Sequence, residues 1–313
     1  MKLTFLGTRG EIDARTSRHR MHTSLLVSWR RSHVMIDCGA DWQRRRVARI
    51  SPTAILITHA HPDHADGLKN GTSCPVFATQ ESWNTMRPGA IPERVVVVRD
   101  GTSFPASMPA QDDPIVREIR SGFPFVVLHA GNLGFYGAWG TLLKAAEILR
   151  NENVGLVFIG DGANRAALEA AASGSPNVRF LPFRPVEQVP HVMMAGDLHI
   201  VTVRRGLEGV VVPSKLYSIL AAGRPVLAVA ARESDAARIV IESGCGLAAD
   251  PDDPAAVAAA IRELRGDPAR LIEMGRLARD TAQKYARVNE LQRFVAVMEE
   301  AALGKNGGNH LGS

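Results

Sequence analysis

The spacing of hydrophobic residues changes along the chain, and the change falls between residues 101 and 114. Before it, short apolar runs separated by turns predict strands at 3–7, 24–29, 34–39, 54–59, 75–79 and 94–98. After it, longer apolar runs rich in β-branched residues alternate with helical patterns. This alternation is typical of βαβ units whose parallel sheet is covered on both faces. The pattern therefore predicts an α/β chain made of two different halves.

The elements of the second half can be placed individually. Strands are expected at 123–131, 154–162, 178–183, 198–203 and 224–230. Helices are expected at 141–152, 163–174, 186–196, 213–223 and 234–244. A long helical tail is expected from Asp253 to about Ala302, with Asp252 and Pro254 as its start signal.

A linker separates the two halves. The stretch GTSFPASMPAQDDP is rich in Pro, Ser, Gly and Asp and has no periodicity. We therefore expect a first domain at 1–104, a linker at 105–114, a second domain at 115–302 and a disordered tail at 303–313.

Composition narrows the class of protein. The 313 residues suffice for two domains, and 45% hydrophobic and 22% charged residues are ordinary for a globular protein. No apolar run approaches the roughly 20 residues of a membrane span, and the N-terminus lacks the pattern of a signal peptide. The three cysteines are far apart, which favours reduced thiols over disulfides. We expect a cytoplasmic protein.

Arginine is concentrated between Arg15 and Arg49, although the formal net charge is only +5. Such a patch suits RNA or phosphate-bearing substrates. The patch has no interleaved aromatic residues and no nucleic-acid motif, so a solvated basic face is the preferred interpretation and nucleic acid is not an expected partner.

The segment THAHPDHADG places four metal-ligand side chains directly after a predicted strand. These are His59, His61, Asp63 and His64. Imidazole and carboxylate groups are ligands of Zn²⁺ and similar ions, and a strand-end loop can bring them together. In an HxHxDH loop the two histidines face one metal, and the aspartate with the following histidine reaches a second. Two adjacent ions can hold the hydroxide nucleophile of a hydrolase.

The segments FLGTRG, RHRMHTSLLV, MIDCGADW and ITHAHPDHADGLKNG resemble metallo-β-lactamase-fold hydrolases of the ribonuclease Z group. The resemblance implies that Asp37 supports the metal loop from behind and that His22 lies near the site mouth. It covers about residues 1–104. The segments that supply the remaining metal ligands in that family are absent, although His129 is a further candidate. Half of such a sandwich exposes one sheet face, which another chain or the C-terminal domain is expected to cover.

Three loops of the second half carry residues suited to a diphosphate. Two are glycine turns after strands, and the third precedes a helix. The residues are Gly131, Asn132, Gly134, Gly160, Asp161, Gly162, Glu208, Pro213, Ser214 and Lys215. Glycines let backbone N–H groups approach phosphates, and a lysine and a hydroxyl at a helix start suit pyrophosphate. Such loops meet at the carboxyl ends of parallel strands.

In this order, these elements resemble the C-terminal donor domain of retaining GT-B glycosyltransferases, from about Phe123 to about Tyr285. The resemblance implies a nucleotide-sugar donor with catalytic Glu208 on the sugar, Lys215 on the diphosphate and the loop of Phe183 on the base.

The chain also departs from the GT-B pattern. Ser218 stands where many relatives have a second glutamate. Phe135, Tyr136 and Trp139 stand in the glycine loop, where an Arg/Lys pair is common. The GT-B acceptor domain is missing.

The sequence supports three interpretations of what the protein does. The favoured one is a nucleotide-sugar-dependent glycosyltransferase acting on a glycan or lipid-linked acceptor. The second is a zinc-dependent hydrolase of a phosphodiester or related ester. The third is an inactive fusion of two incomplete enzymes.

Overall fold

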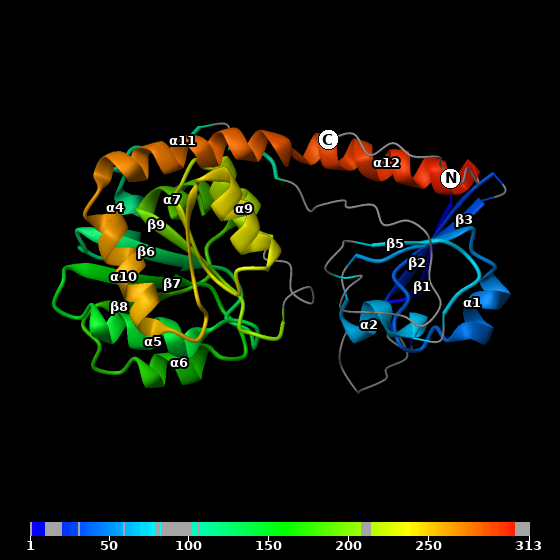
Figure 1. Ribbon diagram of the computed structural model, residues 1–313, viewed down its shortest axis with the longest axis horizontal. Helices are drawn as coiled ribbons and strands as arrows, with labels where there is room; N and C mark the ends of the chain where they lie inside the picture. Colours follow the sequence, from blue (N-terminus) through cyan, green and yellow to red (C-terminus); the bar gives the residue numbers. More distant parts are fainter. Residues whose placement is uncertain are drawn as a thin grey trace. The chain divides into compact units, whose positions relative to one another are not determined.

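The fold is taken from a computed structural model, which describes residues 2–9, 21–30, 32–58, 60–69, 71–78, 82, 102–105, 107–207 and 214–303. The described residues divide into two compact units. The first lies within 1–99 and 288–313, and the second within 100–208 and 213–287. Figure 1 shows the elements of both units.

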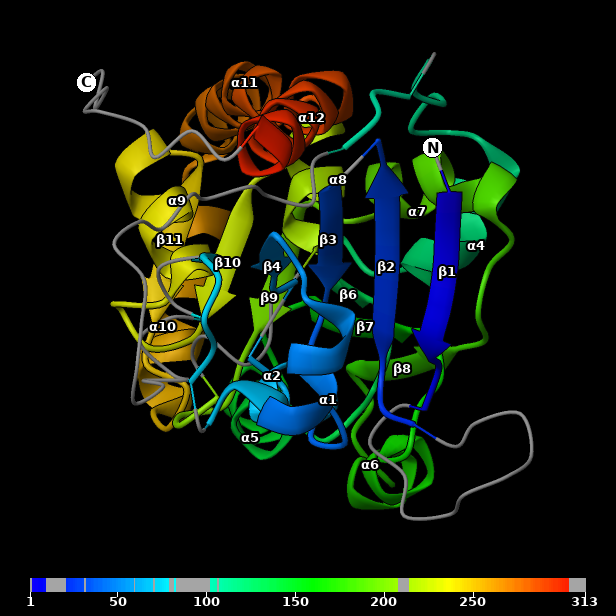
Figure 2. The ribbon, with the colours of Figure 1, turned by 90° about the vertical axis from the view of Figure 1, so that its right-hand side faces the viewer.

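The first unit contains a five-stranded mixed sheet in the order β1-β2-β3-β4-β5. Its strands are β1 (Lys2–Gly7), β2 (Ser24–Trp29), β3 (Ser32–Ile36), β4 (Ala54–Leu56) and β5 (Val76–Phe77). The first three strands pair antiparallel and the last three pair parallel. Figure 2 shows β1, β2 and β3 side by side. The strands predicted before residue 80 are confirmed, while 94–98 lies outside the described residues.

Both faces of this sheet carry apolar clusters. On one face Met35 and Ile55 pack with Trp42 and Leu68, close to the helices α1 (Arg44–Ile50), α2 (Pro62–Ala65) and η1 (Asp66–Leu68). Helix α1 was not predicted, because its four arginines conceal an apolar face on which Val47 is buried.

The opposite face is contacted by the last of the described helices. The helical tail consists of α10 (Pro254–Arg265), α11 (Pro268–Lys284) and α12 (Arg287–Leu303). Phe294 of α12 packs against the cluster of Val34, Ala54, Leu56 and Phe77. Residues from Val288 therefore group with the first unit, whereas the sequence led us to expect them in the second domain.

The second unit contains a six-stranded sheet in the order β11-β10-β9-β6-β7-β8, and all its strands are parallel. The strands are β6 (Phe125–Ala130), β7 (Val154–Ile159), β8 (Val178–Leu181), β9 (Leu198–Thr202), β10 (Val226–Val229) and β11 (Gly246–Ala249). This is the predicted Rossmann-like parallel sheet. Five of its strands were predicted, and β11 was not.

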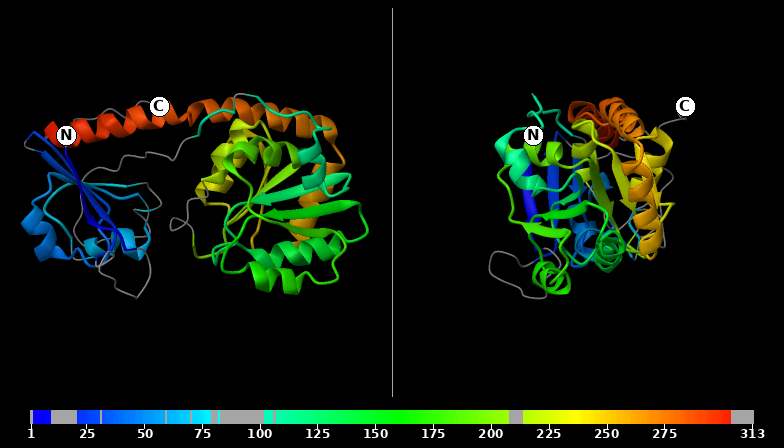
Figure 3. Two further views of the ribbon diagram at one scale, coloured as in Figure 1. Left: turned by 180° about the vertical axis from the view of Figure 1, so that it is seen from behind. Right: turned by 90° about the vertical axis from the view of Figure 1, so that its left-hand side faces the viewer.

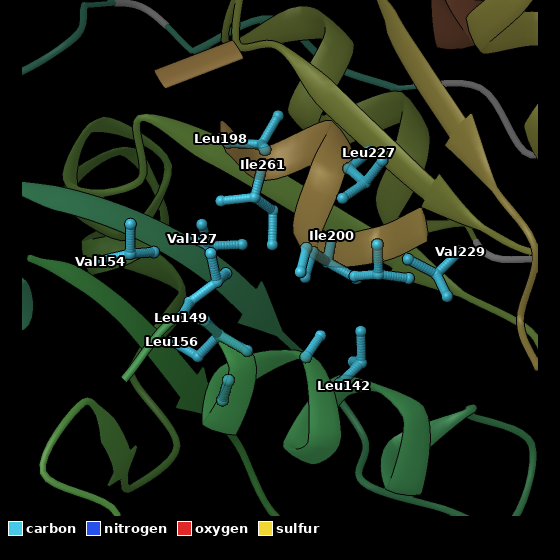
Figure 4. Close-up of a cluster of buried hydrophobic side chains, with 14 of the residues drawn as sticks. Val127, Leu142, Leu149, Val154, Leu156, Leu198, Ile200, Leu227, Val229 and Ile261 are labelled. Carbon is cyan, nitrogen blue, oxygen red and sulfur yellow. The ribbon is translucent and has the colours of Figure 1, made fainter. Parts of the chain in front are cut away.

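Helices cover both faces of this sheet (Figure 3). They are α4 (Pro114–Arg120), α5 (Trp139–Ile148), α6 (Arg165–Ala171), α7 (Val189–Ala195), α8 (Lys215–Ala221) and α9 (Asp235–Ser243), together with α10 and α11. On one face Leu142 of α5, Leu149 at the C-cap of α5 and Ile261 of α10 pack against strand residues such as Val127 and Ile200 (Figure 4). On the other face α4, α7, α8, α9 and α11 contribute a second cluster.

Part of the expected linker, 105–114, and the residues just before it, which were expected in the first domain, pack onto the second unit. Phe104 and Met108 contact its hydrophobic core, and the backbone of Thr102 forms a bridge to Ala286. Asp113 caps α4 by accepting hydrogen bonds from the backbone amides of Ile115 and Val116. Pattern alone could not show this packing, because the segment has no periodicity of its own.

Candidate functional site

The strand order of the second unit creates a switch point between β6 and β9. From β6 the sheet continues to β7 and β8, whereas from β9 it continues in the opposite direction to β10 and β11. Open α/β sheets bind ligands beyond the carboxyl ends of the strands at such a point. Gly131 follows β6 there, Gly160 follows β7, and Lys215 begins the helix after β9.

The two glycine loops are bonded to each other. The Gly131 amide donates to the Ile159 carbonyl at 2.8 Å, and the Leu133 amide donates to the Asp161 carbonyl at 2.7 Å. A Cβ atom added at Gly160 would lie only 2.0 Å from the Gly131 carbonyl oxygen. The close approach of the two backbones therefore requires glycine at residue 160.

Gly162 has the same role further along the loop. Its φ is +153°, and an added Cβ would lie 2.4 Å from Oδ1 of Asn132. Gly134 instead supplies its carbonyl oxygen, which accepts from Nδ2 of Asn164 at 2.9 Å and from Nε1 of Trp139 at 2.6 Å. The predicted glycines thus form one rigid double loop.

Lys215 reaches across this loop to His129. Its Nζ lies 3.1 Å from Nε2 of His129, which is at the end of β6. A Cβ added at Gly131 would lie 3.1 Å from the same Nζ, so the lysine lies over the glycine. The aromatic ring of Tyr136 also lies near the lysine, with its centroid 5.8 Å from Nζ.

Burial sets the charge state of this pair. Burial lowers the pKa of Lys215 from its ordinary 10.5 to about 8. Burial, followed by the charge of Lys215, holds the pKa of His129 well below its ordinary value, so the imidazole is neutral. Tyr136 has a raised pKa because it is partly buried, so its phenol is also neutral.

Aromatic residues stand in the first glycine loop, where an Arg/Lys pair is common in the GT-B pattern. Trp139 is buried and meets the ring of His129 edge-on at 4.8 Å. The Tyr136 hydroxyl donates to the Asn132 carbonyl at 2.7 Å. Phe135 is 68% exposed. Two of the three aromatic side chains therefore hold the loop in shape, and one faces solvent.

The other predicted donor-binding residues lie at the rim. Asn132, Asp161 and Ser214 are exposed, and the Asp161 carboxylate accepts from the Gly162 amide at 2.8 Å. Phe183, on the loop after β8, is 75% exposed. Glu208 and Pro213 lie outside the described residues. The roles of these residues in donor binding remain predictions.

In the first unit, Asp37 supports the predicted metal loop. Its Oδ2 lies 2.7 Å from Nδ1 of His64, and its Oδ1 accepts from the Thr58 amide at 2.8 Å. Burial alone would lower the pKa of His64, but the hydrogen bond and charge of Asp37, with the charge of Asp63, raise it. Because Nδ1 of His64 contacts Asp37, the other ring nitrogen of His64, Nε2, points away from Asp37.

Two donors of this loop approach one another. Nε2 of His64 lies 3.2 Å from Oδ2 of Asp63, and Nδ1 of His61 lies 2.6 Å from Oδ1 of Asp63. His59 lies outside the described residues. Within the part of the chain that is described, no three His, Cys, Asp or Glu residues are placed to hold a metal ion. A catalytic zinc usually has three protein ligands, so the described residues fit partial coordination only.

His22 lies beside this loop. A Cβ added at Gly39 would lie 2.4 Å from Cβ of His22 and 2.0 Å from the Asp63 carbonyl oxygen. The ring of His22 is held by Asp41, whose Oδ2 is 2.7 Å from Nδ1. Asp41 also accepts from the buried guanidinium of Arg9 at 2.8 Å. His22 therefore has a structural partner of its own next to the metal loop.

Comparison with known proteins separates the two units. The family "Glycosyl transferases group 1" matches residues 124–267. This segment, which contains most of the second unit, is similar to group 1 glycosyltransferase domains. "Probable glycosyltransferase WbjE" of Pseudomonas aeruginosa is 30% identical over 192 residues, which cover 60% of this chain and 48% of that protein. The chain thus spans about half the length of this curated relative.

Solved structures agree with the glycosyltransferase domain at the level of fold. Anabaena HepE in complex with UDP-glucose has a TM-score of 0.64 and 18% identity, covering 82% of this chain and 74% of HepE. Such a likeness shows the GT-B type of fold. It does not show what this domain binds.

The first unit has shorter similarities. The family "Anti-Pycsar protein Apyc1" matches residues 1–93. Ribonuclease Z of Methanopyrus kandleri is 39% identical over 70 residues, which cover 21% of this chain and 24% of that enzyme. A metallo-β-lactamase-like fold for this unit therefore stays a prediction. Among the helices that are described, none is long and apolar enough to cross a membrane.

Proposed function

We propose that the glycosyltransferase domain binds a nucleoside-diphosphate sugar at the carboxyl ends of β6, β7 and β9 and transfers its glycosyl group. The observation that carries this proposal is the position of Lys215 over the double glycine loop, 3.1 Å from His129, at the switch point of the sheet. A cation held over interlocked glycine loops suits a diphosphate. The complexes of HepE with UDP and UDP-glucose make a uridine diphosphate sugar the first donor to test.

Each predicted residue then has a role toward the donor. Lys215 contacts the diphosphate, with Ser214 beside it, and Phe183 stacks on the base. Glu208 contacts the sugar and is the proposed catalytic group. A serine at residue 218 removes the carboxylate that would hold the ribose, so we expect weak nucleotide binding. The acceptor is a glycan or a lipid-linked acceptor, and transfer requires that it be held in line with the donor.

The test is a calorimetric titration of the full chain with UDP, followed by an assay of sugar release from UDP-glucose. We expect saturable binding of one UDP per chain. Lys215→Ala should weaken it about tenfold or more, because a charge-assisted contact is lost. The control Lys144→Ala changes an exposed lysine on α5 and should bind as the wild type does. No binding by the wild type, or equal binding by Lys215→Ala, would contradict the proposal.

A second proposal concerns the first unit: its HxHxDH loop binds a divalent metal such as Zn²⁺ through His59, His61, Asp63 and His64. The supporting observation is the 3.2 Å between His64 Nε2 and Asp63 Oδ2. Two ligands about 2.0–2.1 Å from a tetrahedral zinc are about 3.3 Å apart, so this spacing suits a shared ion. The described donors are fewer than the three protein ligands that a catalytic zinc usually has, so the proposal is limited to metal binding and does not include hydrolysis.

Zinc content of the purified, zinc-supplemented protein tests this proposal. We expect bound zinc in the wild type and its loss in His64→Ala, while His33→Ala, on β3, should retain it. Absence of zinc from the wild type would contradict metal binding. If the chain bound neither zinc nor UDP, the third interpretation, an inactive fusion of two incomplete enzymes, would be supported.

A further inference from the structure

We propose that His129 is a positioning residue, whose neutral imidazole accepts a hydrogen bond from Lys215 and fixes the ammonium over the glycine loop. The use of this ammonium for a diphosphate rests on the proposed function. The positioning itself does not, because it is a property of the ligand-free protein.

The two side chains come from distant parts of the sequence. His129 is the penultimate residue of β6, and Lys215 begins α8, 86 residues later. The order of the strands brings them together. The imidazole is 1% exposed, and its plane is held by the edge-on contact with Trp139. The acceptor is therefore rigid.

Hydrogen-bonding chemistry fixes the direction of the contact. A lysine ammonium has three donors and no acceptor, so Nε2 of His129 must be the unprotonated nitrogen. One of the three N–H groups of Lys215 is then used, and two remain for an anion. The structure places no carboxylate within ion-pair distance of Nζ in the described part of the chain. The imidazole thus orients the ammonium of Lys215 without neutralising its charge, which can then interact with an anionic ligand.

Other groups around the pair do not supply a competing charge. Tyr136 is neutral because its pKa is raised. His199, on the neighbouring strand β9, is buried and neutral, and its pKa falls to about 3 because of burial and the charge of Arg224. Its Nε2 is occupied by the Met193 carbonyl oxygen at 2.9 Å. Among these three side chains His129 is therefore the one that accepts a hydrogen bond from Lys215, and Tyr136 contributes its ring face at 5.8 Å.

Direct titration of Lys215 in the ligand-free full chain tests the inference. The chain has six lysines, so selective ¹³C labelling allows the Cε signal of Lys215 to be assigned by its loss in Lys215→Arg. His129→Gln retains an acceptor, and His129→Leu removes it. The control His191→Leu makes the same replacement on α7.

We expect the pKa of Lys215 to fall by about one unit or more in His129→Leu, since an acceptor that favours the ammonium is lost. It should stay within about half a unit of the wild-type value in His129→Gln and in the control. Equal shifts in both His129 variants, or no shift in either, would overturn the inference. If His129→Leu does not fold, His129→Phe takes its place, because it keeps a ring against Trp139.

A UDP titration of the same variants adds a separate readout. His129→Leu should bind UDP about tenfold more weakly than His129→Gln at pH 7. Equal affinities of the two variants would overturn the positioning role. If the wild type binds no UDP, the proposed function fails, while the titration of Lys215 still decides whether His129 positions it.

Discussion

The side chain of Lys215 lies over Gly131, such that a methyl group added to the glycine would be 3.1 Å from Nζ and 3.2 Å from Cε. Gly131 also has a φ of +139°, which L side chains rarely adopt. Glycine is thus required at this position both by the backbone and by the lysine above it.

Gly131→Ala should therefore lower both stability and UDP affinity. The strained backbone should cost about 1–3 kcal/mol of unfolding free energy, and the displaced lysine should weaken UDP binding about tenfold. Urea denaturation and calorimetry measure the two effects. The control is Gly140→Ala on α5, where an added Cβ has no neighbour within 4 Å. Because alanine favours helix, it should be neutral or stabilising by up to about 1 kcal/mol, and UDP binding should not change. Wild-type behaviour of Gly131→Ala would contradict this explanation.

The lowered pKa of Lys215 makes a prediction about stability and pH. The folded value is about 8 and the ordinary value 10.5, so between these pH values the unfolded chain binds more protons. The contribution of Lys215 to the unfolding free energy is therefore least favourable below pH 8 and rises through the window, by about 3 kcal/mol in total. The unfolding free energy of the variant Lys215→Met should lack this rise. Urea denaturation of the wild type and of Lys215→Met from pH 7 to pH 10 measures this rise. The contributions of other titrating groups cancel in the difference between the two unfolding free energies. A difference that did not vary with pH would contradict a lowered pKa of Lys215.

Binding of UDP should show the opposite dependence on pH. A diphosphate favours the ammonium form of Lys215, so affinity should fall once the pH exceeds about 8. His129 stays neutral throughout this range because of its lowered pKa, and Tyr136 stays neutral until above pH 10 because of its raised pKa. Calorimetric titrations at pH 7, 8 and 9 measure the trend. Constant affinity across them would show that the charge of Lys215 does not contribute.

The contact of α12 with the first unit predicts a local effect of Phe294. Phe294 is partly buried against Val34, Leu56 and Phe77, so Phe294→Ala should destabilise the first unit by about 1–3 kcal/mol. Leu291→Ala, which changes a side chain that is 56% exposed, should cost less than about 0.5 kcal/mol. Hydrogen exchange measured by mass spectrometry would locate the loss in β3 and β4. Equal effects of the two changes would contradict this packing.

Much of the second unit could be predicted from sequence because buried parallel strands are continuous apolar runs. The strand β11 was missed because its sequence, GLAA, has small residues of low strand propensity. It is specified instead by its pairing with β10, where an added Cβ at Gly246 would lie 1.8 Å from the Val226 carbonyl oxygen. A glycine that is required by a neighbouring strand leaves no periodic pattern in its own segment of the sequence.

The glycine loops of the candidate site could be predicted because strand-end glycines mark turns. The partner of Lys215 could not, since His129 is 86 residues away and adjacent only through the order of the sheet. The helix that meets the first sheet was also not predictable, because Phe294 contacts strands more than 200 residues earlier in the chain. Long-range pairing, rather than local pattern, decides both features.

Hydrogen exchange of the full chain, measured with and without saturating UDP, locates the nucleotide site on the chain. We expect protection at the loops after β6 and β7 and at the start of α8, with no change in β1 to β5. Protection that is absent from these loops, or that appears only in the first unit, would contradict a nucleotide site in the glycosyltransferase domain.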